Sequence, residues 1–394
     1  MQNTQTTNLK IPGINLQEVT PVPVPELLTG VPVFLGVAKV RSPSTEQELV
    51  EEAQLRPQRL TLWNHFGQCL EQASPYLSQA VRGFFENGGR LCYVVALKNN
   101  LLEELSRGLN ISEALDAVDL ICAPDVMGGP PHSALTKLDQ KAILDKQVKI
   151  LEHCDRMGAR FAILDALNQS LVAIDQQRQQ LQGGNGALYV PWLKVENVAD
   201  PIPPCGHVAG LYAQCDRAFG VHRTPANYPL EGILDLTLNL SDAEQASLNS
   251  DSQPGVNCLR TFRGRGMRVW GGRTLSQDPQ WQYISVRRLF LTVGRWINLN
   301  LADVVVFEPN NFSLWLRLER ELSVYCESLW RRGALQGATL KEAFYVKCDA
   351  ETNPPSLREV GQVCVELGLA PTLPGEFIRI SLIHGESGVT LSPS

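Results

Sequence analysis

Short apolar segments alternate with amphipathic helical segments between residues 74 and 190, and this alternation constrains the fold most strongly. A helix is predicted over residues 74–86, because Asn87, Gly88 and Gly89 form a helix stop that also permits a tight turn. A second helix is predicted over 135–156 and is closed by Gly158. The predicted strands are 91–96, 119–123, 161–164 and 187–190. Alternation of this kind favours a mainly parallel sheet with helices packed on its faces.

Polar and proline-rich stretches indicate where the chain crosses the surface. Residues 176–186 (QQRQQLQGGNG) predict a surface loop, because they are polar and rich in glycine. Residues 200–204 (DPIPP) mark a change of organisation, and residues 249–255 (NSDSQPG) are typical of a linker or a surface crossing. The last of these stretches suggests that a second domain begins near residue 255.

The C-terminal part repeats the same pattern on a smaller scale. Amphipathic helices are predicted over 285–298 and 312–330, with a β-branched strand over 303–307 between them. A strand is predicted over 344–347, and the period of two over 363–369 predicts another. Residues 377–384 (FIRISLIH) form an isolated strand-like segment, followed by a polar tail over 385–394.

Length and composition narrow the class of protein. A chain of 394 residues with 44% hydrophobic and 19% charged residues can form two globular domains with extensions. A net charge of -6 over this length argues against a general nucleic-acid binder. No apolar run reaches the roughly 18 residues of a membrane-spanning helix. Because residues 1–10 also lack the apolar centre of a signal peptide, we expect the chain to be made and kept in the cytoplasm, or to leave it by another route.

The ten cysteines favour reduced structural thiols over a metal site. They contain no Cys-x-x-Cys pair, and several lie inside predicted buried strands. The one compact cluster of soft ligands is Cys205, His207, Cys215 and His222. Four such groups could in principle hold zinc, but their spacing matches no recognised zinc motif. We therefore expect no metal ion.

Two aspartates keep an enzymatic alternative open. Asp125 and Asp165 each follow an apolar strand, where catalytic carboxylates of α/β enzymes often lie. The chain has no phosphate-binding glycine loop, no dinucleotide fingerprint and no nucleophile elbow. Helix capping and strand-end turns therefore explain both residues better. The alternative is an α/β hydrolase or nucleotide-using enzyme working around Asp125, Asp165 and His207.

The N-terminus contains a short strand held on a stiff spacer. Residues 13–19 (GINLQEV) predict this strand, and the prolines of residues 21–25 (PVPVP) favour an extended, semi-rigid segment after it. A strand placed in this way is suited to pairing with another protein chain. The residues alone equally allow it to fold back onto its own sheet.

Several separated stretches resemble the contractile tail sheath proteins. The clearest are residues 269–276 (VWGGRTLS), 281–291 (WQYISVRRLFL) and 304–309 (VVVFEP). The resemblance recurs upstream, in the same order, over residues 77–95, 187–195 and 202–227. It implies a structural protein without catalytic site, cofactor or metal. The subunit would form the contractile sheath around the inner tube of a phage tail, a phage-tail-like bacteriocin or another injection system.

The resemblance also implies an architecture and a set of partners. We expect an α/β fold of mixed, mainly parallel sheets with flanking helices in two domains, plus extended N- and C-terminal strand arms. The expected boundaries are 1–30 for the N-terminal arm and proline-rich linker, 31–254 for the first domain, 255–375 for a tube-facing C-terminal domain and 376–394 for the C-terminal arm. Sheath subunits form stacked hexameric rings that are metastable when extended, and their contraction drives the tube through a target envelope.

The partners implied by the family are other copies of the chain, the inner tube protein, and the baseplate and terminal cap proteins. Nucleic acid and direct membrane insertion are not expected. Assembly is expected in the cytoplasm, as part of a particle that is then released or anchored to a membrane.

Two sets of residues follow from the resemblance as candidate contact sites. Sheath proteins donate terminal arms to the sheets of neighbouring subunits, where alternate side chains fill pockets. The candidate arm residues are Ile14, Leu16, Val19, Ile378, Ile380 and Leu382. The helix over 312–330 is, by position, the candidate for the element that faces the tube.

This helix has one apolar face, formed by Trp315, Leu318, Leu322, Tyr325 or Cys326, and Leu329. Its candidate tube-binding residues lie largely on the other faces and are Arg317, Arg320, Glu321, Glu327 and Arg331. An ordinary surface helix with a solvated charged face would show the same pattern, so the residues alone do not decide between the two.

Overall fold

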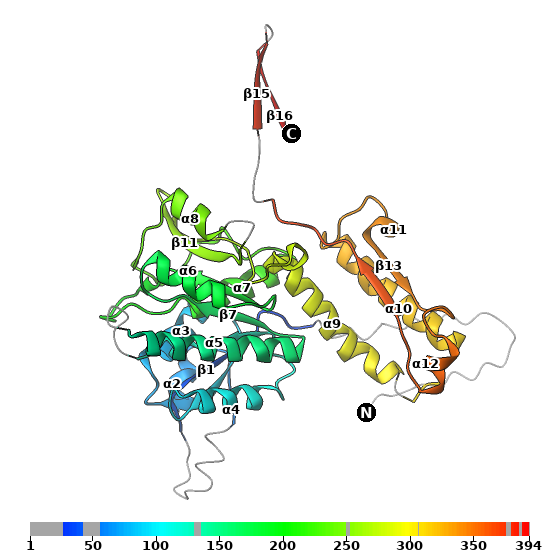
Figure 1. Ribbon diagram of the computed structural model, residues 1–394, viewed down its shortest axis with the longest axis horizontal. Helices are drawn as coiled ribbons and strands as arrows, with labels where there is room; N and C mark the ends of the chain where they lie inside the picture. Colours follow the sequence, from blue (N-terminus) through cyan, green and yellow to red (C-terminus); the bar gives the residue numbers. More distant parts are fainter. Residues whose placement is uncertain are drawn as a thin grey trace, which may run out of the picture.

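The computed structural model describes residues 27–41, 56–129, 135–249, 253–305, 307–375, 380–385 and 388–393. Within them the chain forms a large sheet body and a smaller C-terminal body, joined by the long helix α9 (Ile284–Val305) (Figure 1). The candidate arm residues Ile14, Leu16, Val19 and Ile378 lie outside the described residues. In the described part, no helix is long and apolar enough to cross a membrane.

An eight-stranded sheet with the order β12-β11-β8-β7-β6-β1-β5-β3 forms the large body. Its six central strands are parallel, and the edge strands β12 and β3 are antiparallel to their neighbours. The strands are β1 (Pro32–Val37), β3 (Gln58–Leu60), β5 (Cys92–Leu97), β6 (Leu120–Cys122), β7 (Phe161–Asp165), β8 (Gly186–Val190), β11 (Val256–Phe262) and β12 (Gly266–Trp270). The predicted mainly parallel α/β sheet is confirmed.

Helices cover both faces of this sheet, as the alternating pattern predicts. Helices α3 (Pro75–Glu86) and α7 (Cys205–Phe219) share one hydrophobic core with one face of the strands. Helices α4 (Leu102–Ser112), α5 (Lys137–Met157) and α6 (Leu171–Gln180) share the other core. Gly206 allows α3 and α7 to pack closely, because a Cβ atom there would lie 2.2 Å from the carbonyl oxygen of Ala80.

Smaller elements complete the large body. They are β2 (Lys39–Val40) paired with β4 (Leu70–Glu71), β9 (Leu193–Lys194) paired with β10 (Asp235–Leu236), and the helices α2 (Asn64–Cys69) and α8 (Asp242–Leu248). The two predicted helix ends are confirmed. Helix α3 ends at Asn87, and α5 ends at Gly158, which has a left-handed φ of 63°.

The surface loop predicted over 176–186 is wrong, because residues up to Gln180 belong to α6. The helix is polar but not fully exposed. The buried Gln177 donates a hydrogen bond to Oε1 of Gln147 at 2.7 Å and accepts one from the backbone of Leu167 at 2.8 Å. Hydrogen bonds to buried side-chain amides therefore hold a helix whose sequence lacks an apolar stripe.

The C-terminal body is built from α9 and α10 (Phe312–Arg331), the short helices α11 (Leu340–Ala343) and α12 (Pro355–Glu359), and a two-stranded antiparallel sheet of β13 (Phe344–Lys347) and β14 (Glu366–Leu369). Trp296 of α9 stacks on Tyr325 of α10, with ring centroids 3.9 Å apart. The strand predicted over 303–307 is wrong, because α9 continues to Val305. The helix begins earlier in the chain and continues through this short run of valines, because its cooperativity outweighs their preference for a strand.

The large sheet extends further along the chain than expected. Strands β11 and β12 follow residue 254, yet they pair with β8 and with each other in the large body. Residues 249–255 are thus a crossing between α8 and β11 and not a link between domains. The boundary between the large body and the C-terminal body lies after β12, where α9 begins.

The C-terminal tail is not a single strand followed by an unstructured end. Strand β15 (Ile380–Gly385) pairs with β16 (Gly388–Pro393) as an antiparallel hairpin, so the polar tail supplies a second strand. The two strands form a sheet of their own, and no other described strand joins it. Figure 1 shows this hairpin standing apart from both bodies.

Candidate assembly surfaces

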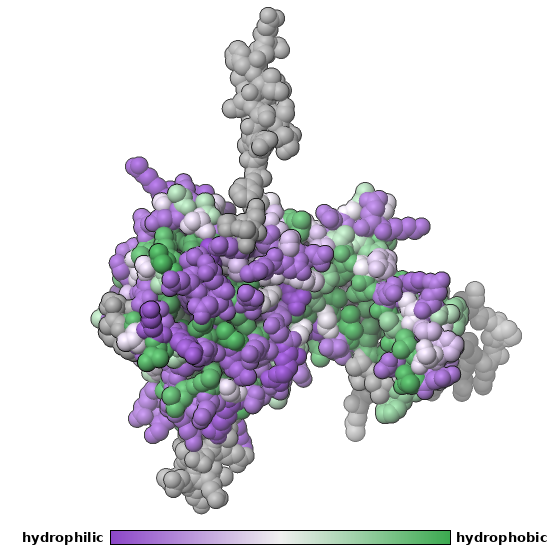
Figure 2. Space-filling model, in the orientation of Figure 1, coloured by the Kyte–Doolittle hydropathy of each residue, from purple (hydrophilic) through white to green (hydrophobic). Residues whose placement is uncertain are grey.

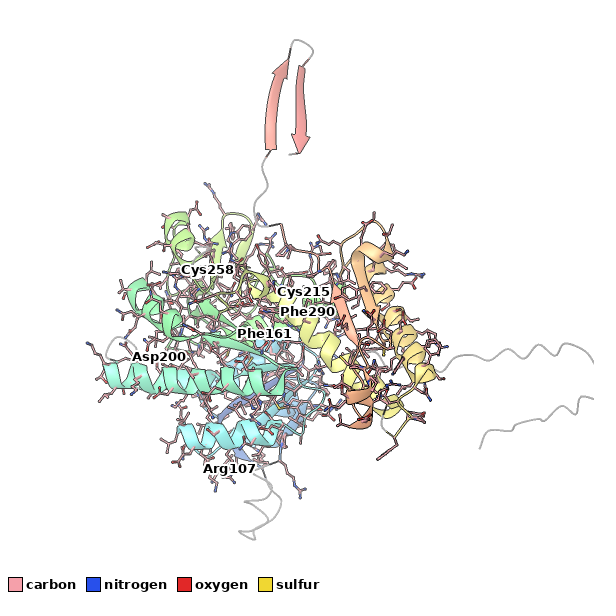
Figure 3. The ribbon with its side chains drawn as sticks, turned by 45° about the vertical axis from the view of Figure 1, so that its right-hand side comes forward. Arg107, Phe161, Asp200, Cys215, Cys258 and Phe290 are labelled. Carbon is pink, nitrogen blue, oxygen red and sulfur yellow. The ribbon has the colours of Figure 1, made fainter. Side chains whose placement is uncertain are left out.

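A buried cluster of charges fixes α9 to the large body. Arg288 donates two hydrogen bonds to the carboxylate of Asp216 in α7, at 2.7 and 2.6 Å, and one to Asp119 at 2.9 Å. All three side chains are almost fully buried. Burial alone would lower the pKa of Arg288, but the two carboxylates outweigh it and raise that pKa, so the guanidinium stays charged. Figure 3 shows Phe290 of α9 where the two bodies meet.

Arg295 adds a second anchor about two turns further along α9. Its guanidinium donates hydrogen bonds to the backbone carbonyls of Leu28 at 3.1 Å and Asp116 at 2.9 Å. The side chain is buried. The first half of α9 is therefore held by the large body, and its Leu289 and Val293 also pack in a core with Leu329 of the C-terminal body.

The face of α10 that packs inward matches the sequence prediction. Leu314, Trp315, Leu318, Leu322, Cys326 and Leu329 are buried. Asn311 caps the helix, because its side chain accepts hydrogen bonds from the backbone of Ser313 and Leu314. The sequence left Tyr325 or Cys326 as the apolar-face residue at one turn of this helix. Cys326 is buried, and Tyr325 is only partly buried.

The candidate tube-binding residues lie on the outward side of α10. Arg317, Arg320 and Arg331 are exposed, and Glu321 and Glu327 are partly exposed. Arg331 pairs with Glu327 at 2.5 Å and Arg320 pairs with Glu321 at 3.0 Å. Arg317 has no ion-pair partner within the described residues. Apolar residues share this side, since Leu316 is 50% and Val324 60% exposed.

The two-stranded sheet of the C-terminal body has free edges. Strands β13 and β14 pair only with each other along their length, within the described part of the chain. Tyr345 of β13 is 58% exposed, and Figure 2 shows hydrophobic side chains on the face between α9 and β13. The candidate arm residues Ile380 and Leu382 lie in β15, on the separate hairpin.

A cleft of about 1180 Å³ lies at the junction of the two bodies, and its residues were not singled out from the sequence as a group. Its walls come from the edge of the large sheet, from α8, from the end of α10 and from residues 372–375 that lead to the hairpin. Arginines from four separate segments line it: Arg223, Arg260, Arg273 and Arg332. His222 was singled out as a possible ligand, and the lining residues within 219–227 and 270–273 lie in stretches that carried the resemblance.

Two family models match adjacent parts of this chain. The phage tail sheath protein central domain matches residues 110–275, and the phage tail sheath C-terminal domain matches residues 276–382. Together the matches run without a gap over well over half of the 394 residues. The chain belongs to the phage tail sheath family. It is therefore a structural sheath protein of a phage tail or contractile injection system and not an enzyme.

Individual sheath proteins agree with this assignment. A putative prophage major tail sheath protein of Pseudomonas aeruginosa (strain UCBPP-PA14) is 28% identical over 96 residues, which are 24% of this chain and 25% of that protein. The match thus spans about a quarter of this curated relative.

Solved sheath structures match far more of the chain. A contracted sheath complex of an extracellular contractile injection system, PVC, is 28% identical with a TM-score of 0.74, and the match covers 97% of this chain and 99% of that one. A chain in the 6-fold symmetrised baseplate of the anti-feeding prophage is 26% identical with a TM-score of 0.75, and 95% of this chain and 99% of that one are covered.

The two aspartates of the enzymatic alternative have structural roles in this sheath protein. Asp125 accepts hydrogen bonds from Ser74 Oγ at 2.5 Å and from the backbone of Val37 at 2.6 Å, which ties the start of α3 to the end of β1. Asp165 accepts a hydrogen bond from the backbone N–H of Cys205 at 2.8 Å, at the first turn of α7. Burial raises the pKa of both carboxyl groups, that of Asp165 to about 7.

The soft-ligand cluster is dispersed in the fold. Cys205 and His207 lie at the start of α7, where His207 is buried against Gly83 of α3. Cys215 lies near the end of the same helix and contacts the carbonyl oxygen of Arg223. His222 follows α7 and lines the cleft. Across the described residues, no three His, Cys, Asp or Glu side chains are placed to share a metal ion.

Proposed function

We propose that this chain is the repeating subunit of a contractile sheath, in which rings of six subunits stack helically around an inner tube. The observation that carries the proposal is the match over nearly the whole chain to the contracted PVC sheath complex. The 6-fold symmetrised baseplate of the anti-feeding prophage supports the number of subunits in a ring and an association with baseplate proteins. Terminal cap proteins and the inner tube complete the proposed partners.

Strand exchange is the proposed link between subunits. Among the described residues the sheet of β13 and β14 has two strands, and a two-stranded sheet is marginally stable by itself. Its free edges and the hydrophobic face beside β13 are suited to receiving further strands, which would gain affinity from main-chain hydrogen bonds. The donors would be residues 13–19 and β15 of neighbouring subunits, with Ile14, Leu16, Val19, Ile378, Ile380 and Leu382 filling the pockets.

Helix α10 is the proposed contact with the inner tube. Its outward side combines Arg317, Arg320 and Arg331 with the apolar Leu316 and Val324. Exposed ion pairs contribute only about 0 to 1 kcal/mol each. A contact made from many such pairs, including those of Glu321 and Glu327, can hold the register of tube and sheath and still be released.

Contraction is proposed to use energy stored when the extended sheath is built. The sequence contains no nucleotide-binding loop that could supply fuel. Packed interfaces switch between discrete arrangements, so a trigger at one end can pass from ring to ring as rigid-body movement. The charge cluster at Arg288 would keep α9 and the large body together while exchanged strands act as hinges.

Truncation of the N-terminal arm tests the proposed assembly. Deletion of residues 1–20 should leave a folded, soluble subunit that no longer forms sheath, because the donated strand is removed. A finer version places two charges in the pockets with Ile14→Glu and Leu16→Glu, and the matched control carries Asn3→Glu and Gln5→Glu before the predicted strand. Electron microscopy should show sheath for the control only. Normal sheath from the truncated chain would exclude exchange of this arm.

A further inference from the structure

Phe307, in the connection between α9 and α10, is the most exposed of the large hydrophobic side chains that the structure describes. Its relative exposure is 102%, and its backbone φ is 65°, in the left-handed region that bulky residues rarely adopt. Phe312, the first residue of α10, is exposed as well. Two exposed aromatic rings, one of them on an unfavourable backbone conformation, indicate a surface shaped for a partner.

Hydrogen bonds hold the turn around Phe307 in one conformation. The backbone N–H of Glu308 donates to the carbonyl oxygen of the last residue of α9 at 3.1 Å. Asn310 donates from Nδ2 to the carbonyl oxygen of Gln362 at 2.7 Å, and its Oδ1 accepts from the indole Nε1 of Trp315 at 2.7 Å. The ring of Phe307 is therefore presented by a fixed turn, and a partner that binds it does not have to order a loose loop.

The cleft at the junction of the two bodies offers apolar walls for such a ring. The exposed Phe219 and Leu373 line it together with Trp270 and Pro374. Arg223 lies over the ring of Phe219, 5.4 Å from the ring centroid, and guanidinium groups also bind aromatic rings. A cleft of about 1180 Å³ can admit a phenylalanine side chain and its flanking turn, because pockets for small ligands measure about 300 to 1,000 Å³.

The ring and the cleft lie at opposite ends of α10. The helix has 20 residues, so Phe312 at its start is about 30 Å from Arg332 and Gly333, which line the cleft just past its end. Phe307 precedes the helix and is fully exposed, so it does not fill the cleft of its own chain. A cleft that receives this ring must therefore belong to another molecule.

We infer that the turn 307–311 of one subunit inserts Phe307 into the cleft of a second copy of this chain. Because donor and acceptor lie at opposite ends of one helix, the contact is head to tail and repeats from one subunit to the next. Residues 372–375, which lead to the C-terminal hairpin, form part of the cleft wall, so the inserted ring also orients the root of the proposed exchange arm. This inference rests on the proposed assembly as a sheath. It gives a role to residues 304–309, which carried the resemblance but take no part in the proposed arm and tube contacts.

Substitutions that change polarity at constant size test the ring. Phe307→Asn and Phe307→Leu place side chains of similar volume on the turn, and asparagine tolerates the left-handed backbone. Full burial of a phenylalanine side chain corresponds to a change of about tenfold to a hundredfold in an equilibrium constant. Phe307→Asn should therefore raise the protein concentration needed for sheath formation by about tenfold or more, and Phe307→Leu should raise it much less.

Thermal melting of the unassembled subunits separates this loss from a folding defect. The Phe307→Asn subunit should melt at or above the wild-type temperature, because the strain of the left-handed backbone is reduced. A Phe307→Asn chain that forms sheath as readily as the Phe307→Leu chain would overturn the inference. If wild-type chains form no sheath at all, the proposed function fails; if they do and Phe307→Asn assembles normally, only this contact is wrong.

The same polar change on the acceptor side tests the cleft. Leu373→Asn should raise the concentration needed for sheath formation by about fivefold, because part of the apolar contact is lost. Leu138→Asn is the matched control, since Leu138 is an exposed leucine of α5 that does not line the cleft. The chain with both Phe307→Asn and Leu373→Asn should be less defective than the product of the two effects, because both remove one contact. A Leu373→Asn chain that behaves like the control would contradict the assigned acceptor.

A photoreactive side chain identifies the occupant of the cleft directly. Sheaths are assembled from equal amounts of isotopically heavy and light chains in which p-benzoylphenylalanine replaces Phe307. Illumination should join position 307 of one chain to peptides containing residues 219–223 or 372–375 of another, which gives heavy–light pairs. Cross-links only to the inner tube protein, or only to other peptides of the sheath chain, would exclude the cleft of a second copy as the binding site.

Discussion

Removing the charge of Arg288 should destabilise the large body more than any surface substitution. The Arg288→Met variant keeps a side chain of similar length but leaves the carboxylates of Asp216 and Asp119 without their ion-pair partner, and these side chains are only 1% and 6% exposed. Asp119 retains hydrogen bonds from the backbone of Gly30 at 3.0 Å and Val31 at 2.7 Å. Asp216 keeps a side-chain hydrogen bond with Thr29, but both of its hydrogen bonds from Arg288 are lost, so most of the cost falls on this residue. Breaking a buried pair in this way costs about 3 to 5 kcal/mol.

Urea unfolding of the soluble subunit, followed by circular dichroism, measures this loss. Neutralising the stranded charge with Asp216→Asn in the same chain should restore part of the stability, with a coupling energy of about 1 to 3 kcal/mol. Arg331→Met is the control. Its ion pair with Glu327 is exposed, so the change should stay below about 1 kcal/mol. An Arg288→Met protein as stable as this control would refute the claim that the cluster fixes α9.

Three further outcomes follow from the same structure. Arg317→Glu with Arg320→Glu should weaken loading of the sheath onto its tube without changing the free energy of unfolding of the subunit by more than about 0.5 kcal/mol. Raised salt should weaken loading of the unchanged sheath in the same way. Unchanged loading of the double variant in a co-sedimentation assay would mean that another element makes the contact. Burial, then Arg160 and Arg156, lower the pKa of His153 from 6.5 to about 4, so the native state resists protonation there. The associated stability is complete above pH 6.5 and is lost as the pH falls toward 4, by up to about 3 kcal/mol, and His153→Gln should flatten this part of the pH–stability curve. Deletion of residues 376–394 should, like loss of the N-terminal arm, leave soluble subunits that do not elongate in electron micrographs.

The buried strands and the helix stops could be predicted because their signals are local. Strand β7 is an uninterrupted apolar run, and the ends of α3 and α5 are marked by Asn87 and Gly158. The errors arose where distant residues decide the local structure. Helix α6 depends on the buried hydrogen bonds of Gln177, and the last turn of α9 overrides the β preference of its valines. The hairpin partner of β15 carries a two-residue period, with Val389 and Leu391 alternating with Thr390 and Ser392, but the pattern is too short to stand out within a polar tail.

The candidate surfaces divide in the same way. The period of α10 was sufficient to assign its inward and outward faces, because both depend on one helix. The cluster around Arg288 could not be predicted, since its members are 72 and 169 residues apart along the chain. The cleft was equally hidden, because its arginines come from separate segments and converge only in the folded chain. The sequence shows which residues are charged, but it does not show which charged residues lie close together in the fold.

Electron microscopy of isolated extended sheaths, exposed to rising urea in the absence of nucleotide, tests most directly whether this chain builds a sheath that stores its own energy. The account predicts that tubes shorten and widen at urea concentrations below those that unfold the subunit. The circular dichroism should stay unchanged through that step, and the contracted tubes should not re-extend when the urea is removed. Tubes that dissolve directly to monomers, with no contracted form at any urea concentration, would contradict it.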